Sequence, residues 1–308
     1  MPRIATLTLN PAMDVSTGIA RLAPTSKLRC SLPRYEPGGG GINVARVIRN
    51  LGGDSLAVYP AGGPFGAMLQ RALEELGLPA LRVPIAGDTR ESFTVDEGDT
   101  GLQYRFVLPG PTLTPDERQA CLEAIAALAP APSWLVVSGS FPTGVALDFH
   151  DQIAALAQRI GAKLVLDYSG EALRHAVELG GIHLLKPSLH ELSTLTGWAL
   201  ESEADQEAAV RALVERDAVE IVVLSLGAEG ALLASREGVE RFRAFDVPLR
   251  SAVGAGDSVV GATVLALSRG WSLHDAVRYG MAAAAASLMR PGTGLCLAED
   301  VERLFRQA

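Results

Sequence analysis

Cysteine and lysine are both scarce in this chain of 308 residues. The three cysteines lie far apart and form no CxxC pair, at Cys30, Cys121 and Cys296. This usage fits a reducing compartment such as the cytoplasm and argues against a structural zinc site. Only three of the 27 basic residues are lysines: Lys27, Lys163 and Lys186. The excess of arginine is best explained by the nucleotide composition of the gene, although Lys27 and Lys186 fall in segments that matter below.

Long apolar runs, a signal peptide and a positive net charge are also missing. The longest apolar runs are shorter than a membrane span, and residues 1–4 lead straight into an apolar strand. The net charge of −8 disfavours general binding to nucleic acid. With 48 % hydrophobic and 20 % charged residues, the sequence predicts a soluble, globular, cytoplasmic protein that binds neither nucleic acid nor membranes.

Neither of the two common nucleotide-binding signatures is present. The P-loop pattern GxxxxGK[ST] does not occur, and the glycines at 38–43 and 254–261 lack the spacing of the dinucleotide fingerprint GxGxxG. Any nucleotide site is therefore of another type. Glycines nevertheless form a run from Gly38 to Gly41 at the start of a predicted helix. Glycine is costly in ordered structure, so the run indicates either a close approach of backbone to ligand or a flexible loop.

From about residue 134 onward, short apolar runs alternate with helical patterns. The pattern predicts strands at 134–138, 163–167, 182–186 and 219–224, and helices near 148–160, 171–179, 188–196 and 203–216. This order predicts an α/β fold with a mostly parallel sheet and helices on both faces. Ligands bind beyond the carboxyl ends of such strands. Those ends carry Ser138-Gly139-Ser140, Asp167, Lys186 and Ser225-Leu226-Gly227.

The N-terminal third has a different pattern. It predicts a strand at 3–9 and a helix at 41–51 that is closed by two glycines. Residues 89–96 and 102–108 flank a turn at 98–101 and predict a β-hairpin. Together with the turn-rich residues 14–36, this hairpin is expected to form a small β-layer. Because no linker divides the chain, we expect one domain over residues 1–308, with a lid formed by segments of about 14–36 and 88–108.

Residues Gly254, Ala255, Gly256 and Asp257 precede an apolar helix and combine an anion trap with a proton acceptor. Small residues at a helix start let backbone N–H groups approach an anion. Asp257 would repel a phosphate, but it can accept a proton from a hydroxyl that attacks one. A glycine-rich turn with an ordinary first-turn aspartate is an equally good interpretation of these four residues alone.

Other candidate residues are individually less specific. Asp14 follows the first strand and either holds sugar hydroxyls or caps a turn. Arginines in the predicted β-layer are suited to a phosphate, although charges on strands more often form a solvated face. The basic residues of this layer are Lys27, Arg29, Arg90 and Arg105. The five histidines form no metal or nucleophile pattern.

Four segments of the chain resemble the ribokinase-like (PfkB) family of sugar kinases. They are 7–14 (Leu-Thr-Leu-Asn-Pro-Ala-Met-Asp), 38–46, 225–231 (Ser-Leu-Gly-Ala-Glu-Gly-Ala) and 253–258 (Val-Gly-Ala-Gly-Asp-Ser). Within the family, residues 27–30, 36–46 and 103–107 are most similar to the minor bacterial type of 6-phosphofructokinase. The 1-phosphofructokinases and tagatose-6-phosphate kinases usually carry a lysine in the glycine run, where this chain has Gly40. The resemblance therefore favours fructose 6-phosphate as the substrate.

The resemblance implies a Rossmann-like core, a β-sheet lid that pairs subunits into a dimer, and ATP with Mg²⁺ as cofactors. It implies that Asp257 activates the sugar C1 hydroxyl while Gly254, Ala255 and Gly256 stabilise the transferring phosphoryl group. It assigns the sugar to Asp14, Gly39, Asn43 and Ser140, the sugar phosphate to Arg29, Arg90 and Arg105, and ATP to Lys186, Ser188, Ser225, Gly227 and Gly230. Lys27 is a regulatory candidate, and Glu191 would act on the metal through water.

Two positions depart from the family pattern. The family usually reads Asn-x-x-Glu where this chain has Ser188 and Glu191, and relatives often have threonine at Ala252. We expect altered KM or metal preference rather than inactivity. The main prediction is an ATP-dependent 6-phosphofructokinase, with 1-phosphofructokinase and tagatose-6-phosphate kinase as alternatives. A non-catalytic sugar-phosphate sensor on a kinase scaffold is the alternative from another class.

Overall fold

The computed structural model describes residues 4–307. Its large sheet has nine strands in the order β13-β12-β11-β10-β9-β8-β1-β4-β5. These strands are β1 (Ile4–Leu7), β4 (Ser55–Ala61), β5 (Ala80–Pro84), β8 (Trp134–Ser138), β9 (Lys163–Asp167), β10 (Ile182–Leu185), β11 (Val219–Ser225), β12 (Ala231–Ser235) and β13 (Gly238–Phe242). From β11 to β5 all neighbours are parallel, whereas β12 and β13 form an antiparallel edge.

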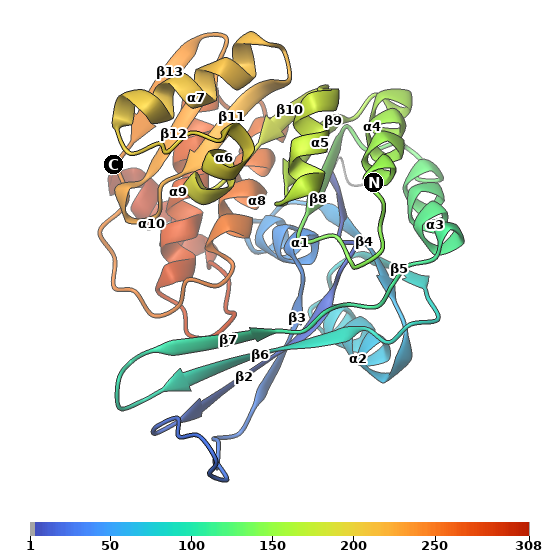
Figure 1. The fold of residues 1–308 in the computed structure, drawn as a ribbon, viewed down its shortest axis with the longest axis vertical. Coiled ribbons are helices and arrows are strands. Elements are labelled where there is room, and N and C mark those ends of the chain that lie inside the picture. The colour runs from blue at the N-terminus through green and yellow to red at the C-terminus, as the bar shows by residue number, and fades with distance from the viewer. Residues whose placement is uncertain (1–3, 308) are drawn as a thin grey trace.

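Helices cover both faces of this sheet, because the strands are apolar on both sides (Figure 1). On one face, Leu135 and Val137 of β8 belong to a core that also contains side chains of five helices. These are α3 (Pro115–Ala126), α4 (Asp148–Ile160), α5 (Glu171–Leu179), α6 (Leu189–Thr196) and α7 (Glu203–Glu215). Trp134 and Val136 face the other core, with α1 (Gly40–Asn50), α8 (Ala255–Ser268), α9 (Leu273–Leu288) and α10 (Ala298–Gln307). The α2 helix (Gly63–Glu75) packs on β4 through a third core. The predicted α/β fold is confirmed.

A separate four-stranded sheet, here called the lid, has the strand order β3-β2-β6-β7. Its strands are β2 (Ala12–Ile19), β3 (Arg34–Gly38), β6 (Arg90–Glu97) and β7 (Gln103–Val107). The predicted hairpin is confirmed, since β6 and β7 are antiparallel with Phe93 opposite Phe106. The lid extends away from the body of the molecule, and its two loops lie at the far end (Figure 1).

The predicted strands and helices between residues 134 and 225 match the observed bounds to within one residue. The apolar helix predicted after Asp257 begins earlier, at Ala255. The first strand was predicted too long: it spans residues 4–7, and Arg3 lies outside the described residues. No helix among the described residues is long and apolar enough to span a membrane. The α1 and α8 helices lie against each other through Gly261, where a Cβ would come within 2.9 Å of Val47. This close approach brings their N-terminal ends to the same edge of the sheet.

Candidate active site

The predicted anion trap forms the beginning of α8. Gly254 is the N-cap, with φ of 76°, and the amide of Ser258 donates to its carbonyl oxygen at 2.9 Å. This left-handed conformation favours glycine, and a Cβ at Gly254 would also lie 2.5 Å from the side chain of Leu295. Asp257 lies in the first turn. The free N–H groups of this turn and the positive end of the helix dipole can therefore stabilise an anion beside the Asp257 carboxylate.

Two side chains hold the carboxylate of Asp257. Nδ2 of Asn43, on α1, donates to Oδ2 at 2.9 Å, and the Ser138 hydroxyl, at the end of β8, lies 3.4 Å from Oδ1. Burial, followed by the negative charge of Asp167, raises the pKa of Asp257 to about 6. The Asn43 hydrogen bond, Lys186 and Ser138 act in the opposite direction. A carboxylate with this pKa is ionised at neutral pH and is a stronger base than an ordinary aspartate.

Lys186 and Asp167 form a buried ion pair beside this base. Their Nζ and Oδ1 atoms are 3.0 Å apart, and the side chains are 7 % and 15 % exposed. Burial alone would lower the pKa of Lys186, but Asp167 outweighs it and the pKa lies above its usual value. A Cβ at Gly256 would lie 3.5 Å from Nζ. The ammonium group therefore lies at the beginning of α8, where it adds positive charge to the anion trap.

A cavity of about 220 Å³ opens between the lid and the beginning of α8. Its lining combines residues of both sheets and of two helix N-termini: Asp14, Gly39, Gly40, Asn43, Arg90, Ser92, Phe93, Thr94, Arg105, Val107, Gly139, Val253, Gly254, Asp257 and Thr293. Seven of the residues predicted for sugar binding, phosphate binding and catalysis therefore line one cavity: Asp14, Gly39, Asn43, Arg90, Arg105, Gly254 and Asp257. A larger hollow of about 580 Å³ lies at the amino ends of β10 and β11, where it is remote from this chemistry.

The cavity is charged on its lid side. The Arg90 guanidinium is fixed by the Asn10 carbonyl oxygen, 3.1 Å from its NH2, and by the Ser92 hydroxyl, 3.0 Å from its NH1. Arg105 is exposed at the cavity mouth. Asp14 is largely buried, and burial raises its pKa to about 6 although Arg90 and Arg105 act to lower it. The lid therefore presents two guanidinium groups and a carboxylate to a ligand, a combination suited to a sugar that carries a phosphate.

The residues predicted to bind ATP lie along neighbouring strand ends. The Ser225 amide donates to the Pro187 carbonyl oxygen at 2.9 Å, which joins the last residue of β11 to the segment after β10. Gly227 and Gly230 have φ of 61° and 112°. Ser188 caps α6 in a capping box: its hydroxyl accepts from the Glu191 amide at 3.2 Å, and Oε2 of Glu191 accepts from the Ser188 amide at 2.8 Å. Ser188 therefore orients Glu191 in place of the family's asparagine.

Among the residues predicted for sugar binding, sugar-phosphate binding and regulation, three lie outside the cavity lining. Ala255 and Gly256 and the predicted ATP and metal residues are not part of this lining either. Lys27 and Arg29 are exposed in the loop between β2 and β3, at the far end of the lid. Ser140 lies after β8, where its hydroxyl accepts from Nδ2 of Asn10 at 3.0 Å. Sequence reasoning assigned no role to five other residues that line the cavity or surround Asp257: Arg46, Ser92, Ser138, Asp167 and Thr293. Position at a strand end was the available indication for Ser138 and Asp167.

Comparison with known proteins decides the family. A model of the pfkB family of carbohydrate kinases matches residues 7–300. The chain belongs to this family. It is a carbohydrate kinase, a phosphotransferase that uses ATP and acts on a hydroxyl group.

The similar proteins include two enzymes named ATP-dependent 6-phosphofructokinase isozyme 2. The enzyme of Mycobacterium tuberculosis is 49 % identical over 100 % of this chain and 90 % of its own length. That of Escherichia coli K12 is 41 % identical over 99 % of this chain and 98 % of its own. The crystal structure of phosphofructokinase-2 from Escherichia coli with fructose-6-phosphate has a TM-score of 0.94, with 40 % identity over 100 % of this chain and 99 % of that one.

Proposed function

We propose that this kinase transfers the γ-phosphoryl group of ATP to the C1 hydroxyl of fructose 6-phosphate. The observation that carries the proposal is the cavity that places Asp257, at the beginning of α8, opposite Arg90 and Arg105 of the lid. The names of the two similar enzymes and the fructose-6-phosphate in the similar crystal structure point to the same substrate. Arg90 and Arg105 would bind the 6-phosphate, and Asp14 would accept hydrogen bonds from sugar hydroxyls.

Asp257 would act as the base. Its carboxylate takes the proton of the C1 hydroxyl as that oxygen forms a bond to the γ-phosphorus, and the bond from phosphorus to the ADP oxygen breaks. The products are fructose 1,6-bisphosphate and ADP. The amides of Gly254, Ala255 and Gly256 and the Lys186 ammonium would stabilise the charge on the transferring group, since they are fixed before the reaction starts.

Gly40 favours fructose 6-phosphate over the alternative sugar phosphates. A Cβ at this position would lie 2.3 Å from Oγ of Ser138 and 2.6 Å from the amide nitrogen of Gly139. The end of β8 therefore leaves no room for the lysine that 1-phosphofructokinases and tagatose-6-phosphate kinases usually carry in this run. Without that lysine, the basic side chains in the cavity lining are those of the two lid arginines, Arg90 and Arg105.

Mg²⁺ fits this site when it is held mainly by the phosphates of ATP. Among residues 4–307, no group of three or more His, Cys, Asp or Glu side chains is placed to hold a metal directly. Glu191 uses Oε2 for the capping box with Ser188, so its Oε1 can accept from a water molecule on the metal. The metal would neutralise phosphate charge.

The three cysteines are free, which suits the proposed cytoplasmic location.

We further propose that two lids pair in a homodimer. Tyr35, Val15, Phe93 and Phe106 lie opposite one another across the four lid strands. Tyr35 and Phe106 are 47 % and 50 % exposed, and a second copy of the lid would cover these two aromatic side chains. Arg29 would then approach a sugar phosphate only from the partner subunit. Truncation of the lid should give monomers with poor sugar binding, and an unchanged mass in solution would contradict the proposed dimer.

The experiment that tests the function is ADP release by the purified protein with MgATP and a panel of sugars. The panel contains fructose 6-phosphate, fructose 1-phosphate, tagatose 6-phosphate and fructose. We expect a strong preference for fructose 6-phosphate. Preference for another sugar phosphate would retain the chemistry but overturn the substrate. Tight binding of fructose 6-phosphate without turnover of any sugar would favour the alternative of a non-catalytic sensor.

A further inference from the structure

Asn43 contacts the proposed base through one particular end of its side-chain amide. Its Nδ2 donates to Oδ2 of Asp257 at 2.9 Å. A carboxylate oxygen only accepts hydrogen bonds when ionised, so the amide must present its nitrogen to Asp257. If the amide turned over, its oxygen would face the carboxylate oxygen, and the bond would be replaced by a repulsive contact.

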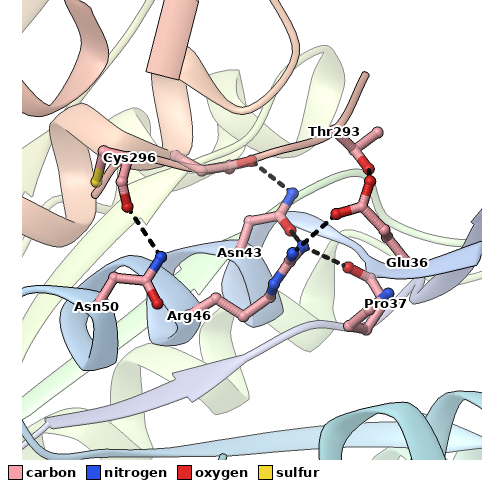
Figure 2. A network of polar contacts seen from close by, with 8 residues as sticks. Glu36, Pro37, Asn43, Arg46, Asn50, Thr293 and Cys296 are labelled. Carbon is pink, nitrogen blue, oxygen red and sulfur yellow. Dashed lines mark hydrogen bonds and ion pairs between the residues drawn. The ribbon is translucent and has the colours of Figure 1, made fainter. Parts of the chain in front are cut away.

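Arg46 fixes the orientation of this amide. It lies one turn further along α1, and its NH1 donates to Oδ1 of Asn43 at 3.1 Å (Figure 2). An arginine only donates hydrogen bonds, so the atom of Asn43 that faces it must be the oxygen. The two neighbours of the amide, one that only donates and one that only accepts, therefore select the same orientation.

Arg46 is itself held by the lid. Its NH1 donates to the Pro37 carbonyl oxygen at 2.8 Å, and its NH2 lies 3.4 Å from Oε1 of Glu36. Pro37 and Glu36 belong to β3, and the Arg46 side chain is only 11 % exposed. Glu36 also accepts from the hydroxyl of Thr293, which lines the cavity (Figure 2).

The segment that carries Thr293 is also attached to α1. Nδ2 of Asn50 donates to the Cys296 carbonyl oxygen at 2.9 Å, so the segment is held at both ends by polar contacts (Figure 2). A continuous path of hydrogen bonds thus leads from Thr293 through Glu36, Arg46 and Asn43 to Asp257. In this order, the four contacts of the path join residues that are 257, 10, 3 and 214 positions apart in the sequence.

We propose that Arg46 is a positioning residue for the reaction: it locks the Asn43 amide so that Asn43 orients the Asp257 carboxylate, and it ties that orientation to strand β3 of the lid. This inference deepens the proposed function, because it rests on Asp257 as the base. It predicts that Arg46 affects turnover without touching the sugar, the nucleotide or the reacting atoms.

The test compares Arg46→Met and Arg46→Lys with the unchanged enzyme, in full-length protein with MgATP and fructose 6-phosphate. Methionine keeps much of the apolar length but donates nothing. Lysine keeps the charge opposite Glu36, but one ammonium cannot reproduce the planar guanidinium contacts to Asn43, Pro37 and Glu36. Arg49→Met is the matched control, since Arg49 is an exposed arginine one turn further along the same helix. Thermal unfolding of each variant identifies those that remain folded.

We expect kcat to fall by about 10- to 100-fold in both Arg46 variants, with KM for ATP within about threefold, because general-base efficiency depends on geometry. The groups that set the pKa of Asp257 are Asp167, Lys186, Ser138 and Asn43, and its charge also interacts with Arg46. The pKa of Asp257 rises when the hydrogen bond from Asn43 is lost, and it rises when the positive charge of Arg46 is removed. The acid limb of the pH profile of kcat should therefore move to higher pH, whereas Arg49→Met should leave it unchanged.

A double-mutant comparison separates positioning from general structure. If Arg46 acts through Asn43, then Arg46→Lys should cost much less in the Asn43→Ala background than in the unchanged enzyme. Equal losses in the two backgrounds, or an unshifted acid limb in a folded Arg46→Lys variant with reduced kcat, would overturn the proposal. Failure of the proposed function would be seen separately, as absence of fructose 6-phosphate turnover by the unchanged enzyme.

Discussion

Nζ of Lys186 lies 3.0 Å from Oδ1 of Asp167, in an ion pair formed at the ends of two neighbouring parallel strands. Asp257 lies close enough that the charge of Asp167 raises its pKa. Asp167, Lys186 and Asp257 therefore bring together two carboxylates and one ammonium group, with one negative charge that the ion pair does not neutralise. This arrangement keeps Asp257 ionised at neutral pH and makes it basic enough to accept a proton.

Asp167→Asn should move the acid limb of activity to lower pH. The pKa of Asp257 is about 6, and the proposed mechanism requires its ionised form, so kcat should fall as pH decreases through about 6. Removing the Asp167 charge lowers this pKa, which is the direction opposite to that expected for the Arg46 variants. The measurement is kcat for fructose 6-phosphate between pH 5 and 8, with Asp151→Asn as a surface control. An acid limb that stays at the same pH or moves to higher pH would contradict the effect of the Asp167 charge on the pKa of Asp257.

Arg90→Ala should weaken the binding of phosphorylated sugars selectively. The loss of charge-assisted hydrogen bonds to a phosphate should raise KM for fructose 6-phosphate by about 10- to 100-fold. KM for fructose, which has no phosphate, should change little. Arg105→Ala should act in the same direction but less strongly, because Arg105 is exposed. Arg71→Ala, an exposed position on α2, is the control. An equal effect of Arg90→Ala on both sugars would show that the phosphate is bound elsewhere.

Gly40→Ala should both destabilise the protein and impair turnover. The added Cβ would lie 2.3 Å from Oγ of Ser138, so the end of β8 or the beginning of α1 must shift. Overpacking of this kind costs about 1–3 kcal/mol. Gly98→Ala, where the nearest atom would be 3.6 Å away, is the matched control. Thermal unfolding and fructose 6-phosphate turnover measure the two effects. Normal stability and activity of Gly40→Ala would contradict the close approach.

Asp257→Asn should make the folded protein more stable at pH 7 to 8. The pKa of this carboxyl is about 6 in the folded state, against an ordinary aspartate value of 3.8. The folded state therefore binds more protons between about pH 4 and 6, and its stability falls as pH rises through that window. Above it the ionised carboxylate costs about 1–3 kcal/mol, which a neutral amide avoids. Chemical denaturation at pH 7.5 and at pH 4 measures the free energy of unfolding of both proteins. A stability gain of Asp257→Asn that is equal at the two pH values would contradict the raised pKa of Asp257.

Much of the fold could be predicted from local sequence pattern. The strands β8 to β11 are short apolar runs bounded by polar residues, and the helices between them have a clear period, so their bounds were predicted to within one residue. The β12–β13 edge and the β4–α2–β5 unit were not predicted. The clear alternation of apolar strands and helices spans residues 134–225, and these two segments lie before and after it.

The site was only partly accessible to sequence reasoning. Asp257, Gly254 and the lid arginines belong to recognisable local motifs or strand ends. The path from Thr293 through Glu36 and Arg46 to Asn43 depends on contacts between residues up to 257 positions apart, and no local pattern reports such pairs. The sequence assigns Ser188 to the ATP site, and the structure shows in addition that Ser188 caps α6 and orients Glu191.

The most direct test of the account is the turnover of Asp257→Asn with MgATP and fructose 6-phosphate. Asparagine has nearly the same shape, so fructose 6-phosphate binding, measured by calorimetry, should remain within a few-fold of the unchanged enzyme. Because the variant cannot accept the C1 proton, kcat should fall by about 10²- to 10⁴-fold. Full turnover by a variant that binds the sugar phosphate normally would contradict Asp257 as the base.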